Sequence, residues 1–275
     1  MFEPTTSVSK VYPVEFSGIV VTYNEARRLR DCLDSLAFCE QLLVVDLGST
    51  DGSAEIAREC GAEVVNHKWV PVVEQVWPDA VSLTRHTWII RADPDEVFPS
   101  PLVDDLVNMI LKSPSLAMIS LPHQYYFRGR PLKTTIWGGI KYAFKVFHKD
   151  RVQLESLAHR GITCKDGYEL KCIESDSNIA IRHYWIDTFS QLFEKHWRYI
   201  EQEGEARYQL GEQFSWRRWV GETGRALKRN LIDYKGMHGG WLGIFLSTFY
   251  AWYVSMSLLS LCRYQKRAEK GAMLD

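Results

Sequence analysis

The sequence predicts an α/β fold, with a mainly parallel sheet covered by helices on both faces and a helical C-terminal region after it. Short apolar, β-branched runs alternate with segments of helical periodicity over the first hundred residues. Runs of this kind without polar alternation are typical of strands buried on both faces. Beyond about residue 185 the strand pattern fades and helical spacing continues. We therefore expect two domains, residues 1–185 and 186–275.

The strands and helices of the first domain follow one another in regular alternation. Apolar residues at helical spacing, such as Leu29, Cys32, Leu33 and Leu36, predict the first helix. Alternation of strands and helices is the pattern of a parallel sheet. The expected elements are a strand at 16–22, a helix at 26–38, a strand at 42–45, a helix at 54–60, and strands at 62–65 and 87–92.

Polar residues gather at the ends of three expected strands, at 22–25, 46–51 and 93–96. In an open α/β sheet, ligands bind outside the carboxyl ends of the strands. The alternative for Thr22 and Asn24 is a structural role as strand-end and helix-capping residues. Asp51 likewise fits the N-cap of the helix that starts near Ser53. Asp46 follows four apolar residues directly, and a buried carboxylate needs a partner.

The third cluster is the sequence Arg-Ala-Asp-Pro-Asp-Glu at residues 91–96. Clustered carboxylates repel one another unless water or a cation compensates their charge. Asp-x-Asp at a strand end suits a hard divalent ion that shares its coordination shell with a diphosphate. A solvated acidic turn is the alternative for an isolated pair of this kind.

Together, the three clusters resemble the motifs of the family-two glycosyltransferases with a GT-A (Rossmann-like) fold. The matching segments are Ile-Val-Val-Thr-Tyr-Asn-Glu at 19–25, Val-Val-Asp-Leu-Gly-Ser-Thr-Asp-Gly at 44–52, and Trp-Ile-Ile-Arg-Ala-Asp-Pro-Asp-Glu at 88–96. The resemblance covers about residues 16–125. Weaker similarity continues in Lys-Val-Phe-His-Lys at 145–149, in Ala-His at 158–159 and in Ile-Arg-His-Tyr at 181–184.

The resemblance implies inverting transfer of a sugar from a nucleotide-diphosphate donor to an acceptor hydroxyl. Carried over by position, Thr22, Asn24 and Glu25 line the nucleotide pocket, Asp46 accepts a hydrogen bond from the base, and Asp93 faces the ribose and diphosphate. Asp95 is then the ligand of a Mg²⁺ or Mn²⁺ ion, which neutralises the charge of the leaving group.

Some positions depart from the family pattern. Glu74 to Asp79 stand where basic and amide residues are usual, Lys145 replaces an arginine, and His238 stands where an aspartate is expected. The general base that an inverting enzyme needs is not identified by the sequence. Glu155 and His159 are our preferred candidates, with Glu96, Asp150 and Asp166 as alternatives.

Composition narrows the function further. The net charge of −1 argues against a broad nucleic-acid surface, because such surfaces carry a basic excess. Six cysteines form no Cys-x-x-Cys pair, so we expect reduced thiols in the cytoplasm. We also expect no signal peptide, because charged residues interrupt the N-terminal segment.

In the C-terminal region, Gly236 to Cys262 contains no formally charged residue and is followed by Arg263, Lys266 and Arg267. Small residues recur every fourth position at Gly243, Ser247, Ala251 and Ser255, which we call the small-residue seam. An interfacial or self-associating helix is the first interpretation, a buried helix the second and a transmembrane span the third.

The function predicted from these observations is a glycosyltransferase of surface polysaccharide or lipopolysaccharide synthesis. It would act on a glycan or lipid-linked acceptor at the inner face of the cell membrane, through peripheral membrane contact and with possible homo-oligomerisation through the C-terminal helices. Two alternatives stay open: a metal-dependent nucleotidyltransferase, and a degenerate GT-A domain that acts as an assembly partner. A nucleotidyltransferase would be expected to carry a glycine-rich basic loop after its first strand, where this chain has Tyr23-Asn24-Glu25.

Overall fold

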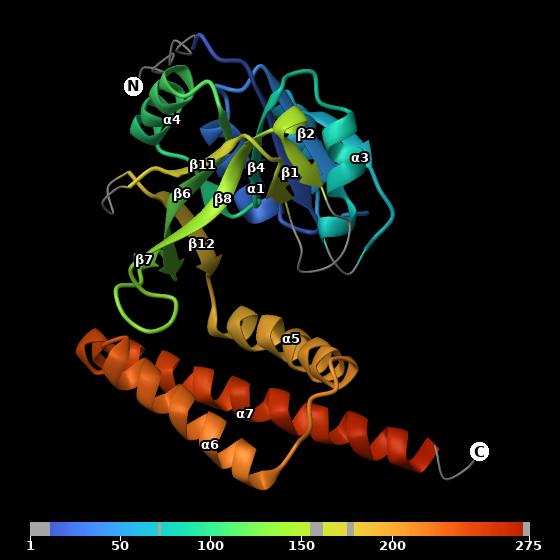
Figure 1. Cartoon of the computed structure of the whole chain (residues 1–275), viewed down its shortest axis with the longest axis vertical. Coiled ribbons are helices and arrows are strands. Elements are labelled where there is room, and N and C mark those ends of the chain that lie inside the picture. Colours follow the sequence, from blue (N-terminus) through green and yellow to red (C-terminus); the bar gives the residue numbers. More distant parts are fainter. Residues whose placement is uncertain (1–11, 71–72, 155–161, 175–178, 272–275) are drawn as a thin grey trace. The chain divides into compact units, whose positions relative to one another are not determined.

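The computed structural model of the chain describes residues 12–70, 73–154, 162–174 and 179–271. It divides into two compact units, shown in Figure 1. The first comprises residues 1–124 and 140–183, and the second comprises residues 125–139 and 184–275. Residues 125–139 therefore belong with the C-terminal helices, although they lie far from them in the sequence.

The first unit contains the alternating elements expected from the sequence. They are β1 (Phe16–Thr22), α1 (Ala26–Ser35), β2 (Gln41–Asp46), α2 (Ser53–Glu59), β3 (Glu63–Asn66), η1 (Val73–Gln75), α3 (Trp77–Ser82), β4 (Trp88–Ala92), β5 (Glu96–Val97) and α4 (Ser100–Lys112). Then follow β6 (Leu116–Phe127), β8 (Ile140–His148), η2 (Lys149–Arg151), β9 (Val152–Leu154), β10 (Ile162–Cys164), β11 (Glu169–Cys172) and β12 (Ile181–Ile186).

The main sheet has the strand order β3-β2-β1-β4-β8-β6-β12-β5, with β11 and β7 (Arg130–Pro131) also paired to β6. Strands β3, β2, β1 and β4 run parallel. Strand β8 is antiparallel to both β4 and β6, and β12 is antiparallel to β5. The predicted α/β sheet is confirmed, and the structure shows that it is mixed, with antiparallel pairing beyond β4.

Helices cover both faces of this sheet because successive strand side chains point to opposite sides. Val20 packs in a core with Leu33 of α1 and Leu102 of α4. Its neighbour Ile19 packs in a second core with Trp77 of α3. Both cores exclude water from β1, whose seven residues are all buried. The sheet is thus a fixed frame for the loops that leave its strand ends.

The second unit is built from α5 (Phe189–Gln209), α6 (Trp216–Lys228), the π-helical turn η3 (Arg229–Asp233), η4 (Gly236–Gly239) and α7 (Gly240–Gly271). Helix α5 begins after Thr188, whose side chain accepts from Gln191 N–H in a capping box. His196 is buried, and its Nδ1 lies 2.8 Å from Leu192 O. It is therefore the packed histidine that its apolar helix face predicts.

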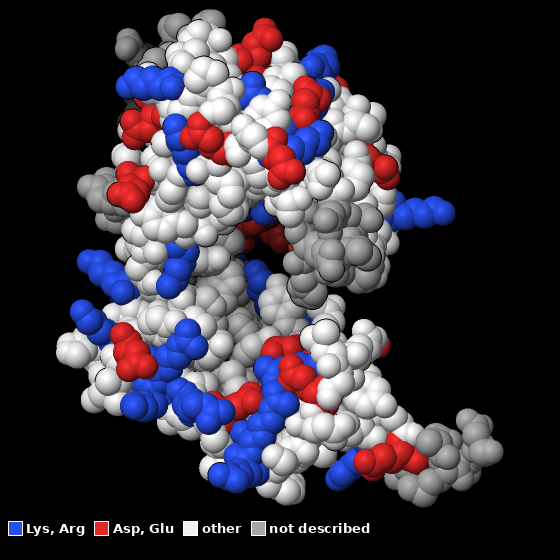
Figure 2. Space-filling view, viewed as in Figure 1, with Lys and Arg blue, Asp and Glu red and all other residues white. Residues whose placement is uncertain are grey.

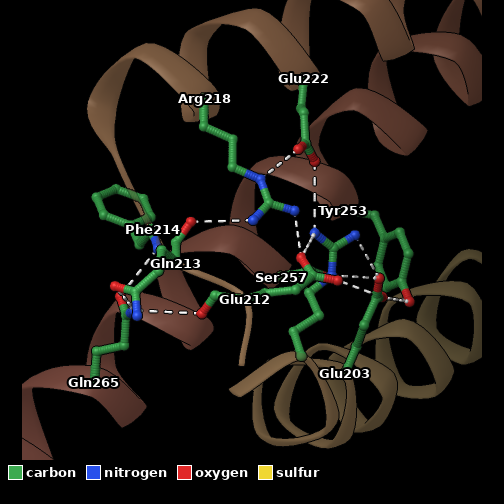
Figure 3. Close-up of polar contacts among 10 residues, drawn as sticks. Glu203, Glu212, Gln213, Phe214, Arg218, Glu222, Tyr253, Ser257 and Gln265 are labelled. Atoms are coloured by element: carbon green, nitrogen blue, oxygen red, sulfur yellow. Dashed lines mark hydrogen bonds and ion pairs between the residues drawn. The ribbon is translucent and has the colours of Figure 1, made fainter. Parts of the chain in front are cut away.

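Charged side chains between the helices of this unit form an internal network (Figure 3). Glu203 of α5 accepts from Arg207 and from Ser257 Oγ of α7. Arg218 and Glu222 of α6 pair with each other, and Arg207 and Glu212 complete the set. The net effect of these contacts lowers the pKa of Glu222: partial burial raises it, and Arg218 and Arg207 outweigh that effect. The network ties α5, α6 and α7 together through side chains that face inward.

The small-residue seam of α7 is filled by the chain itself. A Cβ atom on Gly243 would lie 2.1 Å from Gly236 O. Ser247 is fully buried, and Ser255 Oγ accepts a hydrogen bond of 2.9 Å from Trp219 Nε1 of α6. Gly243, Ser247 and Ser255 of the seam therefore pack within the unit, which favours the second of the three interpretations.

Residues 236–269 form the one stretch, among the described residues, that is long and apolar enough to cross a membrane. Its mean hydropathy is 1.5, and 39% of the window is buried. A core helix of a soluble protein passes the same test of length and composition. This helix packs on α5 and α6, as its buried residues Leu246, Phe249 and Leu258 show.

Candidate functional site

The parallel strands bring the first two polar clusters together. In the register of β1 and β2, Thr22 lies beside Asp46, and both residues are buried. Asn24 has a positive φ of 57°, a conformation that asparagine tolerates better than most residues. Its side-chain Oδ1 accepts from Thr50 N–H at 2.8 Å, and its N–H donates to Ser49 Oγ at 2.9 Å. The loops after β1 and β2 therefore support each other.

Asp46 and Asp51 hold the second loop from both ends. Both carboxylate oxygens of Asp46 accept from Ser49 N–H at 3.2 Å. Asp51 accepts from Ala26 N–H at 2.9 Å and from Ser53 N–H at 3.0 Å. Slight burial raises the pKa of Asp51, but these hydrogen bonds outweigh it and leave the pKa below its ordinary value. Gly52, and not Asp51, occupies the N-cap of α2, so the capping interpretation of Asp51 is wrong.

One polar atom at this edge lacks a partner within the described residues. Thr22 Oγ1 is buried and makes no hydrogen bond to the described chain. Leaving a buried hydroxyl without a partner costs free energy, so such atoms call for a physical explanation. A ligand donor or acceptor at the end of β1 would supply the missing partner.

The acidic turn follows β4, beside β1, where Val20 is the neighbour of Ala92. Asp93, Asp95 and Glu96 therefore lie at the same edge of the sheet as Thr22 and Asp46. The turn is closed in two places: Glu96 N–H donates to Asp93 O at 3.0 Å, and Asp93 N–H donates to Glu96 Oε2 at 3.0 Å. Its conformation is thus set by Glu96 as well as by Pro94.

Glu96 is the centre of a buried group of charges that comes from four strands. Lys145 Nζ of β8 lies 2.8 Å from Glu96 Oε2 and 2.8 Å from Asp93 Oδ2. His123 Nε2 of β6 and His183 Nδ1 of β12 approach Glu96 Oε1 at 3.2 and 3.4 Å. Both imidazoles are therefore within ion-pair distance of the Glu96 carboxylate. Lys145, Glu96 and the two histidines form what we call the Glu96 cluster.

Opposite charges outweigh burial in setting the pKa values of Glu96 and Lys145. Burial raises the pKa of Glu96, but Lys145 and the histidines bring it well below its ordinary value. Burial lowers the pKa of Lys145, but Asp93 and Glu96 raise it above its ordinary value. Glu96 and Lys145 are therefore both charged at neutral pH.

Asp95 and His183 are the two side chains best placed to hold a cation. His183 Nε2 lies 3.2 Å from Asp95 Oδ2, and both side chains are only partly exposed, at 12% and 17%. Among the described residues, no three His, Cys, Asp or Glu side chains are grouped as a complete metal cage. One carboxylate and one imidazole nevertheless fit a Mg²⁺ or Mn²⁺ ion that takes its remaining ligands from a diphosphate and water.

The candidates for the general base lie in different parts of the chain. Glu155 and His159 lie outside the described residues. Glu96 is 1% exposed, and its carboxylate is bound to Lys145. Asp150 follows β8, whose end pairs with Trp88 at the start of β4, opposite the acidic turn. Asp166 adjoins Lys165, whose Nζ donates to the Asp150 backbone oxygen, so both aspartates lie near the same end of β8.

Sequence reasoning missed the cluster behind the acidic turn. In the sequence, Lys145 stands out only as a departure from a family arginine, and His123 belongs to none of the three motifs. A signal was present, since His123 and Gln124 interrupt the apolar run of β6 and both are buried. A buried histidine in a strand needs a partner, and here the partner is Glu96.

The fold is an α/β sheet with polar loops at the carboxyl ends of β1, β2 and β4, and comparison with known families identifies the class of protein. Residues 17–165, more than half of the chain, match the model described as "Glycosyl transferase family 2". The chain belongs to this family and has the GT-A fold. The resemblance noted in the motifs is thereby confirmed at the level of the family.

Similar proteins include uncharacterized glycosyltransferases of Rickettsia. The chain is 31% identical over 100 residues to one from Rickettsia bellii, a match that covers 36% of this chain and 34% of the relative. It is 33% identical over 93 residues to one from Rickettsia felis, covering 34% and 32%. The match thus spans about a third of the length of these relatives.

Among solved structures, the chain is similar to glucosyl-3-phosphoglycerate synthase from Mycobacterium tuberculosis, crystallised with Mn²⁺ and uridine diphosphate. The identity is 21%, the TM-score is 0.35, and the match covers 42% of this chain and 45% of that one.

Proposed function

We propose that the chain transfers a sugar from a nucleotide-diphosphate donor to an acceptor hydroxyl, with inversion and with the help of a divalent cation. The observation that carries the proposal is the acidic turn after β4, beside the interlocked loops of β1 and β2. Family membership supports the transfer of a glycosyl group. Cation dependence and inversion are our inferences from the motifs and from the donor set of Asp95 and His183.

In this proposal each side chain has one task. Asp46 and Thr22, at the ends of adjacent strands, bind the base and nearby donor atoms, and Asn24 and Glu25 line the same pocket. Asp93, oriented by Lys145, faces the ribose and diphosphate. Asp95 and His183 hold Mg²⁺ or Mn²⁺. When bound, the cation neutralises the charge that develops on the departing diphosphate.

Glu155 and His159 are our proposed candidates for the general base. The other candidates are less well placed for this role: Glu96 is buried against Lys145, and Asp150 and Asp166 lie near the end of β8 that pairs with the start of β4. An inverting transfer needs such a group near the acceptor hydroxyl to take up its proton. Glu155→Gln and His159→Gln should therefore lower kcat while donor binding persists, if either serves as the base.

We further propose that the acceptor is a glycan or a lipid-linked sugar of surface polysaccharide or lipopolysaccharide synthesis. The sugar transfer would take place at the cytoplasmic face of the membrane. Six free cysteines support a reducing compartment. The aromatic and basic C-terminal helices support peripheral contact with a membrane.

Calorimetry on a matched pair of aspartate variants tests the cation site. A nucleotide-sugar screen with Mn²⁺, read by thermal stabilisation, first identifies the donor. Asp95→Asn should then lose about 1–3 kcal/mol of cation-dependent donor affinity, because a charged partner is removed at nearly constant shape. Asp150→Asn, at the other end of β4, is the control and should bind like the parent.

Two outcomes would contradict the proposal. Unchanged cation-dependent binding by Asp95→Asn would remove this residue from the site. Absence of donor binding to the parent protein, with any nucleotide sugar and either cation, would favour the assembly-partner alternative.

A further inference from the structure

Helix α6 presents two different faces, and only one of them packs on the rest of its unit. On the inner face, Ala226 is buried and Trp219 bonds Ser255 of α7. Arg218 and Glu222, at the margin of this face, belong to the internal network of Figure 3. The outer face has no such role in holding the helices together.

One sector of the outer face is apolar. At about 100° per residue, Trp216, Val220 and Leu227 fall within roughly 40° of one another around the helix. Trp216 is 66% exposed and Val220 is 62% exposed. Ile232, Met237 and Trp241, which follow α6 in the chain, are also large, apolar and exposed. Scattered apolar residues are ordinary on a surface, but a row along one helix edge is not.

The neighbouring sector of the same face is basic. The same helical rotation places Arg217, Lys228 and Arg225 together, next to the apolar row, and all three are exposed. Within the described residues, no ion pair joins any of these three to an acidic side chain. In Figure 2, Lys and Arg side chains gather over α6 on the visible side of this unit. The outer face therefore carries uncompensated positive charge.

We propose that the outer face of α6 docks the protein on an anionic lipid surface. Its apolar row would enter the boundary between head groups and acyl chains, and its basic row would lie at the level of the lipid phosphates. This inference deepens the membrane location in the proposed function, and it does not depend on the identity of the donor. It places the membrane contact on α6 and not on the small-residue seam of α7, where the chain packs against itself.

Charge and geometry both favour a lipid surface as the partner. An interfacial helix needs an apolar side and a flanking basic side along its whole length, and α6 provides both. An aromatic residue such as Trp216 favours the interface because its ring is amphipathic. A nucleic-acid partner is disfavoured by the apolar row, which phosphates would not contact.

Vesicle sedimentation of the full chain tests the inference. The parent protein should bind vesicles that contain phosphatidylglycerol and phosphatidylcholine, bind pure phosphatidylcholine much more weakly, and dissociate as salt is added. Arg217→Glu with Lys228→Glu should lower the partition coefficient about 30-fold or more, because each basic residue near the surface contributes on the order of 1 kcal/mol. Lys68→Glu with Lys112→Glu makes the same charge change on the first unit and should alter binding less than about twofold.

The apolar row has its own matched variants. Val220→Ser should weaken vesicle binding about fivefold. The valine side chain would be partly buried in the lipid, and serine loses that transfer free energy. Leu210→Ser, at the exposed end of α5, should leave binding unchanged. Thermal unfolding and donor calorimetry on every variant establish that the fold and the nucleotide site are intact.

The other possible results distinguish the docking face from the proposed glycosyl transfer. Failure of the parent to bind anionic vesicles, or unchanged binding by the double α6 variant, would overturn the docking face. If Val220→Ser lowers the sedimentation coefficient of the protein in the absence of vesicles and leaves vesicle binding intact, the outer face of α6 is a contact between copies of the chain. Loss of vesicle binding with normal donor binding would leave the proposed glycosyl transfer untouched. Lack of donor binding with normal vesicle binding would overturn that function alone.

Discussion

Replacement of Lys145 by methionine should destabilise the first unit more than any surface substitution. Lys145 is 4% exposed and lies between two carboxylates, each 2.8 Å from its ammonium group. Methionine fills a similar volume but leaves Glu96, which is 1% exposed, without its main counter-charge. Two histidines remain near Glu96, at 3.2 and 3.4 Å, and compensate only in part.

The magnitude follows from the burial of the pair. Removing one partner of a buried ion pair costs about 3–5 kcal/mol, because the remaining charge stays desolvated. For a unit of this size, each kcal/mol changes Tm by roughly 2–4 °C, so Tm should fall by roughly 6–20 °C. Glu96→Gln in the same chain should recover much of the loss, since two neutral groups then face each other.

Thermal and urea unfolding of four proteins would measure this effect: the parent, Lys145→Met, Glu96→Gln and the double variant. Lys112→Met, on the exposed end of α4, is the matched control and should change stability by less than about 0.5 kcal/mol. A loss below about 1 kcal/mol for Lys145→Met, or no coupling in the double variant, would refute the account of the Glu96 cluster.

Three other predictions concern the nucleotide edge, the helical unit and pH. Asp46→Ala should weaken binding of the nucleoside monophosphate by about 1–2 kcal/mol in calorimetry; if only sugar recognition changes, Asp46 lies elsewhere in the site. Gly204→Ala should lower Tm, because its Cβ would lie 2.2 Å from Ser260 Oγ, whereas Gly224→Ala has open space and should raise stability by about 0.5–1 kcal/mol; equal effects would contradict the packing of α5 on α7. The pKa of Glu96 is depressed in the folded state, so its contribution to stability is present above its unfolded pKa of about 4.3 and is lost as the pH falls below that value. Unfolding measured from pH 7 to pH 3 should show this acid loss in the parent and a smaller loss in Glu96→Gln.

Much of the first unit could be predicted from local patterns. The strand expected at 16–22 is β1 with the same bounds, and the helix expected at 26–38 is α1 with a shorter end at Ser35. Buried parallel strands leave a strong signal, because both of their faces need apolar residues. The direction of the later strands has no such signal, so the antiparallel pairing of β8 emerged only in three dimensions.

The candidate site was likewise predictable from the sequence only in part. Asp46, Asp93 and Asp95 stand out in the sequence because a carboxylate directly after an apolar strand is costly unless it has a task or a partner. Lys145 and His123 do not stand out, because their partner Glu96 is 49 and 27 positions away along the chain. Only strand pairing brings such distant charges together.

The amino-acid sequence alone determined the α/β class, the order of the early strands and helices, and the acidic turn at the end of the fourth strand. Each of these depends on neighbours within a few residues, through side-chain periodicity and turn chemistry. Tertiary structure decided that Glu96 is a buried structural charge, that the small-residue seam of α7 is filled from within, and that α6 has an uncovered face. These properties depend on which distant surfaces exclude water from one another, and chain-local patterns do not encode that choice.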